Sequence, residues 1–507
     1  MTRCIFGKFR DSPGPGPNRS GRIIVERLSI FDHGPVTDIP PNVPPASDTP
    51  PSSPPPPSSS ASPSPPAASP TSLSARLTQR GVRRSRRLWH NYGVFWLGAV
   101  LVGLVSVAYA KLVDFGFELF QRMLTHGFWL PLFVTPLGAA LAIWLTQKFF
   151  RGAEGSGIPQ VIATLQDSRL SKSLLTLRIM FGKIAISFLG ILCGFTIGRE
   201  GPTVQIGASL MYAMRRGYRR SSVHIERQLT LAGAAAGLAA AFNTPLAGVV
   251  FAIEELSRSF VARSSGTLIT AIIFSGVVAL GLQGNYLYFG QIKAISEFTW
   301  ALIPVLIAAS VLTGVAGGLF GWLMLNVPRW MPAQLVNLRR ARPVRFAFLC
   351  GLAIAVIGIV SGGTTFGSGY AEARGLLESH AALSPFYAVL KFAALCVSYL
   401  SGIPGGIFAP SLAIGAGLGN VMAHVTSVIP LPAMAALCMV GYLAAVTQSP
   451  ITSFVIVMEM IDGHQMVIPL MAVALLSTQV SRTIAPSFYH TLAHRFLTPT
   501  VPAPRQA

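Results

Sequence analysis

One long stretch of this chain, residues 392–458, contains no aspartate, glutamate, lysine or arginine. Because roughly 20 apolar residues in a helix cross the hydrocarbon core of a bilayer, this stretch is long enough for more than one crossing. Charged residues make up only 11% of the chain, against about a quarter in soluble domains. Shorter uncharged runs occupy residues 94–110, 127–147, 228–253, 267–292 and 298–328. The sequence therefore predicts an all-α polytopic membrane protein.

Glycine and proline interrupt several of these uncharged runs, and some runs are too short or too long for one simple helix. Inside a bilayer, irregular backbone is tolerated only where protein or a water-filled cavity covers it. We therefore expect broken helices within the membrane part of the chain.

The beginning of the chain has a different composition. Residues 35–70 are mostly proline, serine, alanine, aspartate and threonine, which leaves almost nothing to bury in a core. We predict that residues 1–73 form a disordered cytoplasmic tail, either dispensable or used for binding. Residues 74–496 are predicted to form the transmembrane domain, and residues 497–507 a short C-terminal tail.

Positive charge is concentrated next to the membrane segments. The formal net charge is +21, and a cluster of arginines precedes the first span: Arg76, Arg80, Arg83, Arg84, Arg86 and Arg87. By the positive-inside rule, this cluster places the N-terminus in the cytoplasm. Basic loops against anionic lipid explain the charge better than a nucleic-acid partner does.

Cysteine and histidine patterns give no sign of a metal site. None of the five cysteines forms a C-x-x-C pair, and the nine histidines show no H-E-x-x-H pattern. Four cysteines lie in or beside apolar runs, where they are expected to be small buried side chains: Cys193, Cys350, Cys396 and Cys438. No metal, cofactor or disulfide framework is predicted.

Three glycine-rich turns are followed by proline, at residues 155–159, 198–202 and 405–410. Glycine permits a tight turn and proline fits the first turn of a helix, so each pattern predicts a helix start. Helix N-termini present unpaired N–H groups and a positive dipole end. If the three starts converge inside the membrane, they form an anion site without a full positive charge. Such a site favours a protein that conducts or exchanges anions.

The two halves of the chain repeat each other. The glycine-serine-glycine turn at 155–157 recurs at 367–369, and the segment 238–245 matches 443–450 at nearly the same spacing. Glu254 and Glu459 follow the matched segments in register. Paired halves with broken helices and a site between them are typical of transporters, so we predict repeats over about residues 90–283 and 297–496. The sequence alone leaves open whether the repeats are parallel or inverted.

Acidic residues within apolar surroundings are candidates for function. Glu200 lies inside one of the anion-site turns, where an ionised carboxylate competes with a mobile anion and a protonated one can move away. That arrangement predicts a gate that also couples protons to anions. The alternative is that Glu200 caps a helix and pairs with Arg199.

Glu254 and Glu255 close an apolar run. Adjacent residues point about 100° apart on a helix, so the two carboxylates should have different surroundings. One could relay protons while the other makes a structural hydrogen bond, although a solvated helix end fits equally well. Ser156 offers a hydroxyl to an anion or caps its helix, and Tyr489 reads as an interfacial tyrosine.

Taken together, these motifs resemble those of the CLC family of chloride channels and chloride/proton exchangers. The resemblance covers residues 76–496 and rests on the three turns and on residues 233–255. It implies many tilted helices in two inverted halves and a homodimer with one pore per subunit. It also implies a multi-pass protein of the cell membrane, in bacteria the inner membrane, without regulatory CBS domains.

The resemblance also implies roles for individual residues. Chloride would be held at a central site by the hydroxyl groups of Ser156 and Tyr489 and by the amides of Ile407 and Phe408. Gly157 and Ile158, the neighbours of Ser156, belong to the same site. The frame around Tyr489 matches the family only loosely. The amides of Arg199, Glu200 and Gly201 would line an outer site, with Glu200 as the external gate. Glu255 falls at the internal proton-transfer position.

The predicted function is secondary active exchange of chloride for protons. An acidic residue at position 255 favours an exchanger over a passive, voltage- or pH-gated chloride channel, which remains the alternative. Ser156 favours chloride over nitrate, and the motifs depart from those of fluoride exporters. An enzyme is not expected: Glu254, Glu255 and Arg258 resemble a prenyl-protein protease motif with the arginine one residue too early.

Overall fold

The computed structural model describes residues 70–218, 222–256, 265–284, 288–290, 300–378, 383–426 and 428–498, without the side chains of residues 70–91 and 265. The predicted tail before Pro70, most of the predicted C-terminal tail, Cys4 and Arg258 lie outside the described residues, as do the side chains of the arginine cluster.

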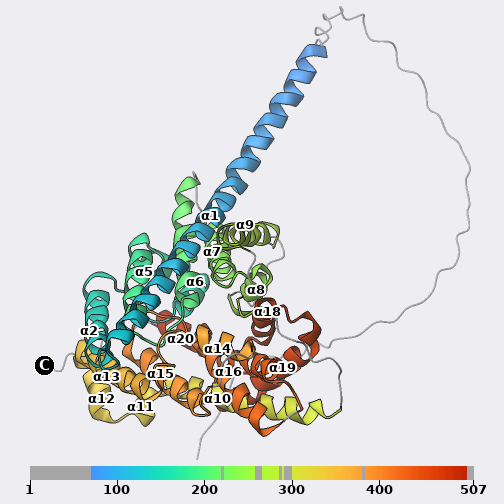
Figure 1. Ribbon diagram of the computed structural model, residues 1–507. Helices are drawn as coiled ribbons and strands as arrows, with labels where there is room; N and C mark the ends of the chain where they lie inside the picture. Colours follow the sequence, from blue (N-terminus) through green and yellow to red (C-terminus); the bar gives the residue numbers. More distant parts are fainter. Residues whose placement is uncertain are drawn as a thin grey trace, which may run out of the picture. The chain divides into compact units, whose positions relative to one another are not determined.

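Helices, joined by short turns and loops, are the elements of secondary structure in the described part of the chain (Figure 1). The first half contains α1 (Pro70–His126), α2 (Pro131–Phe149), α3 (Ile158–Gln166), η1 (Ser168–Leu170), α4 (Ser171–Leu174), α5 (Leu177–Leu192), α6 (Glu200–Ala213), η2 (Met214–Gly217), α7 (Val223–Phe242), α8 (Pro245–Phe251), η3 (Ala252–Leu256) and α9 (Ser265–Gln283). The second half contains α10 (Leu302–Leu325), α11 (Val327–Trp330), α12 (Ala333–Ala341), α13 (Pro343–Val360), α14 (Tyr370–Leu377), α15 (Tyr387–Ser401), α16 (Phe408–Val425), α17 (Leu431–Thr447), α18 (Pro450–Ile461), η5 (His464–Met466), α19 (Val467–Ile484) and α20 (Phe488–Leu497).

Seven helices among the described residues are long and apolar enough to cross a membrane, or eight if the bent pair formed by residues 168–174 and α5 is one span. Four of the uncharged runs fall on α1, α2, α9 and α10, and the run at 228–253 is divided among α7, α8 and η3. The longest run divides into parts of α15 and α18 with α16 and α17 between them. The prediction of an all-α polytopic protein with broken helices is therefore confirmed.

The two halves have matching helix order and matching packing. Helices α6 and α7 pack together in the first half, as do their counterparts α16 and α17 in the second. The residues that follow α7 and α17, Asn243 and Gln448, are both in the left-handed conformation, with φ of 58° and 59°. Each is followed after one residue by a proline that begins the next helix. The repeat seen in the sequence is thus a repeat in structure.

The halves are inverted relative to each other. The equivalent helices α2 and α13 pack together, and Gly351 in the middle of α13 lies against Pro136 near the start of α2. Val344, at the start of α13, lines the same depression as Ala140, which is further along α2. The two helices therefore run antiparallel, as equivalent helices related by a two-fold axis in the membrane plane must.

Small residues allow the central helices to pack closely. A Cβ added to Gly207 of α6 would meet the carbonyl of Gly233 in α7, and a Cβ added to Gly415 of α16 would meet the backbone of Cys438 in α17. Close approach at glycine is the usual basis of helix packing in membranes. Residues 229–242 of α7 and 433–447 of α17 are buried without interruption. The four described cysteines are free and buried, as predicted.

Candidate functional site

The three glycine-rich turns meet at one point inside the protein. Gly198 and Gly406 pair in antiparallel fashion, with N–H to carbonyl distances of 2.8 and 2.7 Å between the two residues. The N–H of Gly405 donates to the carbonyl of Gly155 at 3.3 Å. The backbone therefore joins the turns that come just before α3, α6 and α16.

Each of these helices begins at the turn that the sequence predicts. α3 begins at Ile158 after Gly157, α6 begins at Glu200 after Arg199, and α16 begins at Phe408 after Ile407. None of the three N-termini is capped by the side chain of its N-cap residue. Their first N–H groups and dipole ends thus remain available to an anion.

Glu200 is completely buried, and neither of its carboxylate oxygens has a hydrogen-bond partner of good geometry in the protein. The carboxylate lies against Gly198, where an added Cβ would also approach Ala409 and Pro410 at the start of α16. A buried carboxylate without a partner is unfavourable unless its surroundings compensate for the charge. The helix N-termini supply that compensation, so Glu200 occupies a position suited to an anion.

The alternative prediction was that Arg199 pairs with Glu200. Instead, Arg199 pairs with Asp114. Its Nη1 lies 2.8 Å from both carboxylate oxygens of Asp114 in α1 and 3.2 Å from the carbonyl oxygen of Ala110. The buried guanidinium therefore contacts α1, while the backbone amide of Arg199 lies at the start of α6. A cavity of about 280 Å³ lies at this place, lined by Asp114, Arg199, Glu200 and Tyr288 among others.

Ser156 and Tyr489 lie on the other side of the converging turns. Both are buried, and their hydroxyl groups lie close together without forming a hydrogen bond of good geometry. The Ser156 Oγ also faces Gly201, where an added Cβ would meet it. The Tyr489 ring stacks on Phe408, with centroids 6.2 Å apart. Ser156 does not cap α3, because Gly157 is the N-cap residue.

These contacts bring most of the predicted site residues together. Ser156, Gly157 and Ile158 lie in the turn into α3, Gly201 follows Glu200, and Ile407 precedes Phe408. All six are buried. Tyr489, which the sequence placed at the interface by default, is instead in the protein interior at the start of α20.

Glu255 is also buried, in the π-helical turn η3 that follows α8. One carboxylate oxygen accepts a hydrogen bond from Ser449 Oγ, and the other lies 3.8 Å from His490 Nε2. His490 is the residue after Tyr489. Sequence reasoning missed both Ser449 and His490, because each is far from Glu255 along the chain.

Glu254 has different surroundings, as the angle between adjacent helical residues predicts. Its carboxylate accepts from the N–H groups of Ile451 and Thr452, at 3.0 and 2.5 Å, and so caps α18. Glu459 accepts from Leu246 and Ala247 at 3.2 and 2.7 Å and caps α8. Glu254 therefore has a structural role, whereas Glu255 faces buried polar groups.

Two buried lysines hold the turns in place. Lys183 Nζ donates to the carbonyl oxygens of Ala153 and Gly155, both at 2.8 Å. Lys391 Nζ donates to Thr365 and Gly367 at 3.0 and 3.1 Å in the other half. Sequence reasoning missed both lysines, although their matching positions in the two repeats were a signal. Their charges are directed at carbonyl groups rather than at the anion site.

In the described part of the chain, no group of three or more histidine, cysteine, aspartate or glutamate side chains could hold a metal ion. The contacts described above build the site from helix N-termini, two hydroxyl groups and two buried carboxylates. This arrangement can bind a small anion weakly at several points and can exchange protons at Glu200 and Glu255.

Comparison with known proteins agrees with this architecture. Residues 138–482 match the family model described as voltage gated chloride channel. The chain belongs to the CLC family. The H+/Cl− exchange transporter ClcA of Salmonella agona (strain SL483) is 30% identical over 421 residues, which cover 78% of this chain and 86% of that protein. ClcA of Salmonella arizonae is 30% identical over 451 residues, which cover 83% and 92% of the two chains.

Solved CLC structures share the fold. A slow cyanobacterial Cl−/H+ antiporter superposes with a TM-score of 0.70 at 24% identity, over 81% of this chain and 99% of the other. A CLC-type fluoride/proton antiporter superposes with a TM-score of 0.67 at 22% identity, over 80% and 98%. This CLC protein is therefore a multi-pass membrane protein whose curated relatives are transporters rather than enzymes.

Proposed function

We propose that this CLC protein is a secondary active transporter that exchanges chloride for protons. The observation that carries the proposal is Glu200, a fully buried carboxylate without a hydrogen-bond partner of good geometry at the meeting point of helix N-termini. Such a group can be replaced by an anion when it takes up a proton. The names of the relatives at 30% identity support the same activity.

Chloride binds in this scheme at two neighbouring places. The hydroxyl groups of Ser156 and Tyr489 and the amides of Ile407 and Phe408 hold it at the centre. The amides of Arg199, Glu200 and Gly201, which follow one another at the start of α6, hold it further out. Because only partial charges face the ion, it is bound weakly enough to leave. The charged groups of Lys183 and Arg199 are directed elsewhere: Lys183 donates to backbone carbonyl groups, and Arg199 pairs with Asp114.

Glu200 acts as the gate. When ionised, it competes with chloride for the helix N-termini; when protonated, it loses that attraction and can turn toward the outer cavity. That cavity, of about 280 Å³, gives the side chain room to move and connects it to Asp114 and Arg199. Each movement of chloride past Glu200 therefore requires a change in protonation.

Glu255 supplies protons from the opposite side. Its contacts with Ser449 and His490 form a polar group beside Tyr489, and the carboxylate is buried. A proton held on Glu255 is therefore bound outside the helix N-termini that bind chloride, because Glu255 lies in η3. Separate routes for the two ions are what exchange requires, because a shared route would let one leak with the other.

The remaining features of the proposal follow the family resemblance. The protein forms a homodimer with one pore per subunit in the bacterial inner membrane, and its N-terminus faces the cytoplasm. A passive chloride channel remains the second candidate, because it shares the anion site and differs only in lacking coupling. The buried carboxyl group of Glu255 favours exchange.

The proposal is tested by driving chloride with protons. Purified protein is reconstituted in sealed vesicles with equal chloride on both sides, radioactive chloride outside and the interior made alkaline or acidic relative to the outside. In an exchanger, the proton gradient drives chloride to accumulate on one side, although no chloride gradient was imposed. Equilibration without accumulation would indicate a channel. Fluoride added in place of chloride tests the choice of anion.

A further inference from the structure

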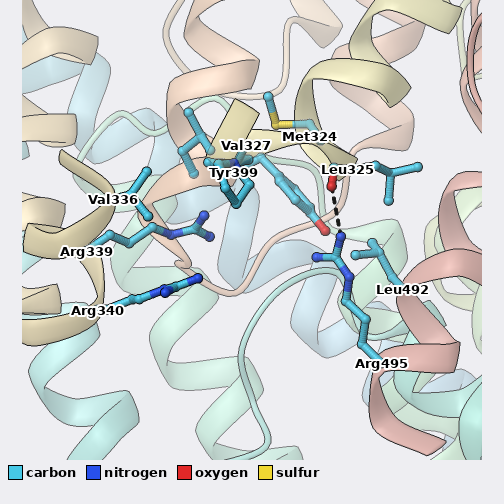
Figure 2. Close-up of a pocket in the computed structure, with 11 residues that line it drawn as sticks. Met324, Leu325, Val327, Val336, Arg339, Arg340, Tyr399, Leu492 and Arg495 are labelled. Atoms are coloured by element: carbon cyan, nitrogen blue, oxygen red, sulfur yellow. Dashed lines mark hydrogen bonds between the residues drawn. The ribbon is translucent and has the colours of Figure 1, made fainter. Parts of the chain in front are cut away.

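A second cavity, away from the chloride site, is lined by three arginines. It has a volume of about 570 Å³ and lies between the end of α10, the short helices α11 and α12, α15 and α20. Figure 2 shows Arg339 and Arg340 reaching in from α12 and Arg495 reaching in from α20. The guanidinium groups therefore converge from two elements that are distant in the chain.

The positive charge in this cavity is not neutralised. No aspartate or glutamate lines it, and within the described residues none of the three arginines forms an ion pair. Arg495 donates one hydrogen bond, from Nη2 to the carbonyl oxygen of Leu325 at 3.0 Å (Figure 2). Burial lowers the pKa of the Arg339 guanidinium, and the positive charge of Arg495 acts in the same direction. Most of the guanidinium donors thus remain available to a ligand.

The cavity is unsuited to the transported ion. A conducting site binds chloride with partial charges so that the ion can leave, whereas three full charges bind an anion firmly. The volume also far exceeds the about 30 Å³ that a water molecule occupies in the liquid, so the cavity admits a ligand of many atoms. Arg495 lies six residues beyond Tyr489 on α20, about 9 Å along the helix at 1.5 Å per residue, which separates the two sites.

The lining favours an anion that carries an organic part. Planar guanidinium groups match phosphate oxygens with paired hydrogen bonds. The hydroxyl of Tyr399 makes no hydrogen bond within the described residues, and the other walls are apolar side chains such as Met324, Val327 and Leu492. The cavity also lies at the end of α10, one of the helices able to span the membrane. Phosphate groups reach this level either as lipid headgroups or in solution.

We propose that the cavity of Arg339, Arg340 and Arg495 is a binding site for a phosphate monoester, distinct from the chloride site. The ligand joins α12 to α20, and Tyr489 lies at the other end of α20. Its source is either the headgroup of an anionic lipid such as phosphatidic acid or a soluble phosphomonoester. This inference does not depend on the exchange of chloride for protons.

The test measures binding to the purified full-length protein in a neutral detergent by isothermal titration, at constant chloride and ionic strength. The probes are glycerol 3-phosphate, dioctanoyl phosphatidic acid and, as the probe without a monoester, dioctanoyl phosphatidylcholine. We expect saturable binding of at least one phosphate monoester, with no binding of phosphatidylcholine. Binding of the lipid alone identifies a membrane source, and comparable binding of glycerol 3-phosphate identifies a soluble one.

Two matched variants locate the site. Arg340→Gln/Arg495→Gln removes two charges from the cavity and should weaken binding at least tenfold. Arg178→Gln/Arg482→Gln removes two exposed charges elsewhere and should leave it unchanged. Retained chloride binding establishes that the first double variant is folded. If that variant does not fold, the single variant Arg340→Gln, at an exposed residue, takes its place. The proposal is overturned if no phosphate probe binds saturably, or if both double variants weaken binding equally.

Discussion

Glu254 and Glu459 cap each other's helices. Glu254 follows α8 and accepts hydrogen bonds at the start of α18, while Glu459 lies in α18 and accepts hydrogen bonds at the start of α8. The two residues occupy equivalent places in the two repeats, so the reciprocal capping follows directly from the internal symmetry. It ties the two halves of this CLC protein together close to Glu255 without using the carboxyl group of Glu255 itself.

Replacing either capping residue should lower stability without affecting coupling. Glu254→Ala and Glu459→Ala each remove charge-assisted hydrogen bonds, and we expect a loss of about 1.5–3 kcal/mol for each. The measurement is the midpoint of unfolding in detergent, with Glu118→Ala on the exposed face of α1 as the control. Unchanged unfolding midpoints, or a Glu254→Ala variant that no longer couples protons to chloride, would contradict the structural role.

Glu255 should behave in the opposite way. Glu255→Gln keeps an oxygen that can accept from Ser449 but removes the titrating group. We expect the fold and chloride movement to persist and chloride-driven proton movement to fall at least tenfold. Glu254→Gln, one residue earlier, is the matched control and should retain coupling. If the two glutamine variants move protons equally well, Glu255 is not the internal proton donor.

Glu200→Gln should separate the two ions. The neutral amide cannot compete with chloride as a carboxylate does, and it carries no exchangeable charge past the helix N-termini. Chloride flux in reconstituted vesicles should therefore continue and lose its dependence on pH, while proton movement ceases. Glu118→Gln serves as the control on α1. Proton movement that survives in Glu200→Gln would exclude the gate proposed above.

The buried lysines should differ in their effect on chloride. Lys183→Met and Lys391→Met each remove the lysine donor from buried carbonyl groups, among them those of Ala153 and Gly367, a loss of about 1–3 kcal/mol for each group left unsatisfied. Only the loop held by Lys183 leads into Ser156. Titration with chloride should therefore show weaker affinity in Lys183→Met, by about tenfold or more, and little change in Lys391→Met. Equal losses of affinity in the two variants would contradict a specific role for the loop held by Lys183.

Local features of this structure were predictable from the sequence. The starts of α3, α6 and α16 follow from glycine and proline at neighbouring positions, since both act on the backbone where they stand. The long uncharged runs predicted the spans for a similar reason, because hydrophobic length is a property of the segment alone. The different surroundings of Glu254 and Glu255 also follow from helix geometry.

Contacts between distant segments were not predictable in the same way. Nothing near Arg199 in the chain indicates Asp114, which lies in α1, and Glu200, its partner in the alternative prediction, has no hydrogen-bond partner of good geometry. His490 approaches Glu255 only because α20 returns to the centre of the protein. Lys183 interrupts an apolar segment, which by itself indicates a functional charge, yet its partners are carbonyl groups in a distant loop.

Proton pumping by a chloride gradient tests the central claim most directly. The wild-type protein is sealed in vesicles with a chloride gradient, a pH-sensitive dye inside and an opposing pH gradient across the membrane. Exchange predicts that chloride flowing down its gradient drives protons uphill, against the imposed pH difference, and that a protonophore abolishes the signal. Chloride movement with no uphill proton movement would contradict the account and leave this CLC protein as a passive chloride pathway.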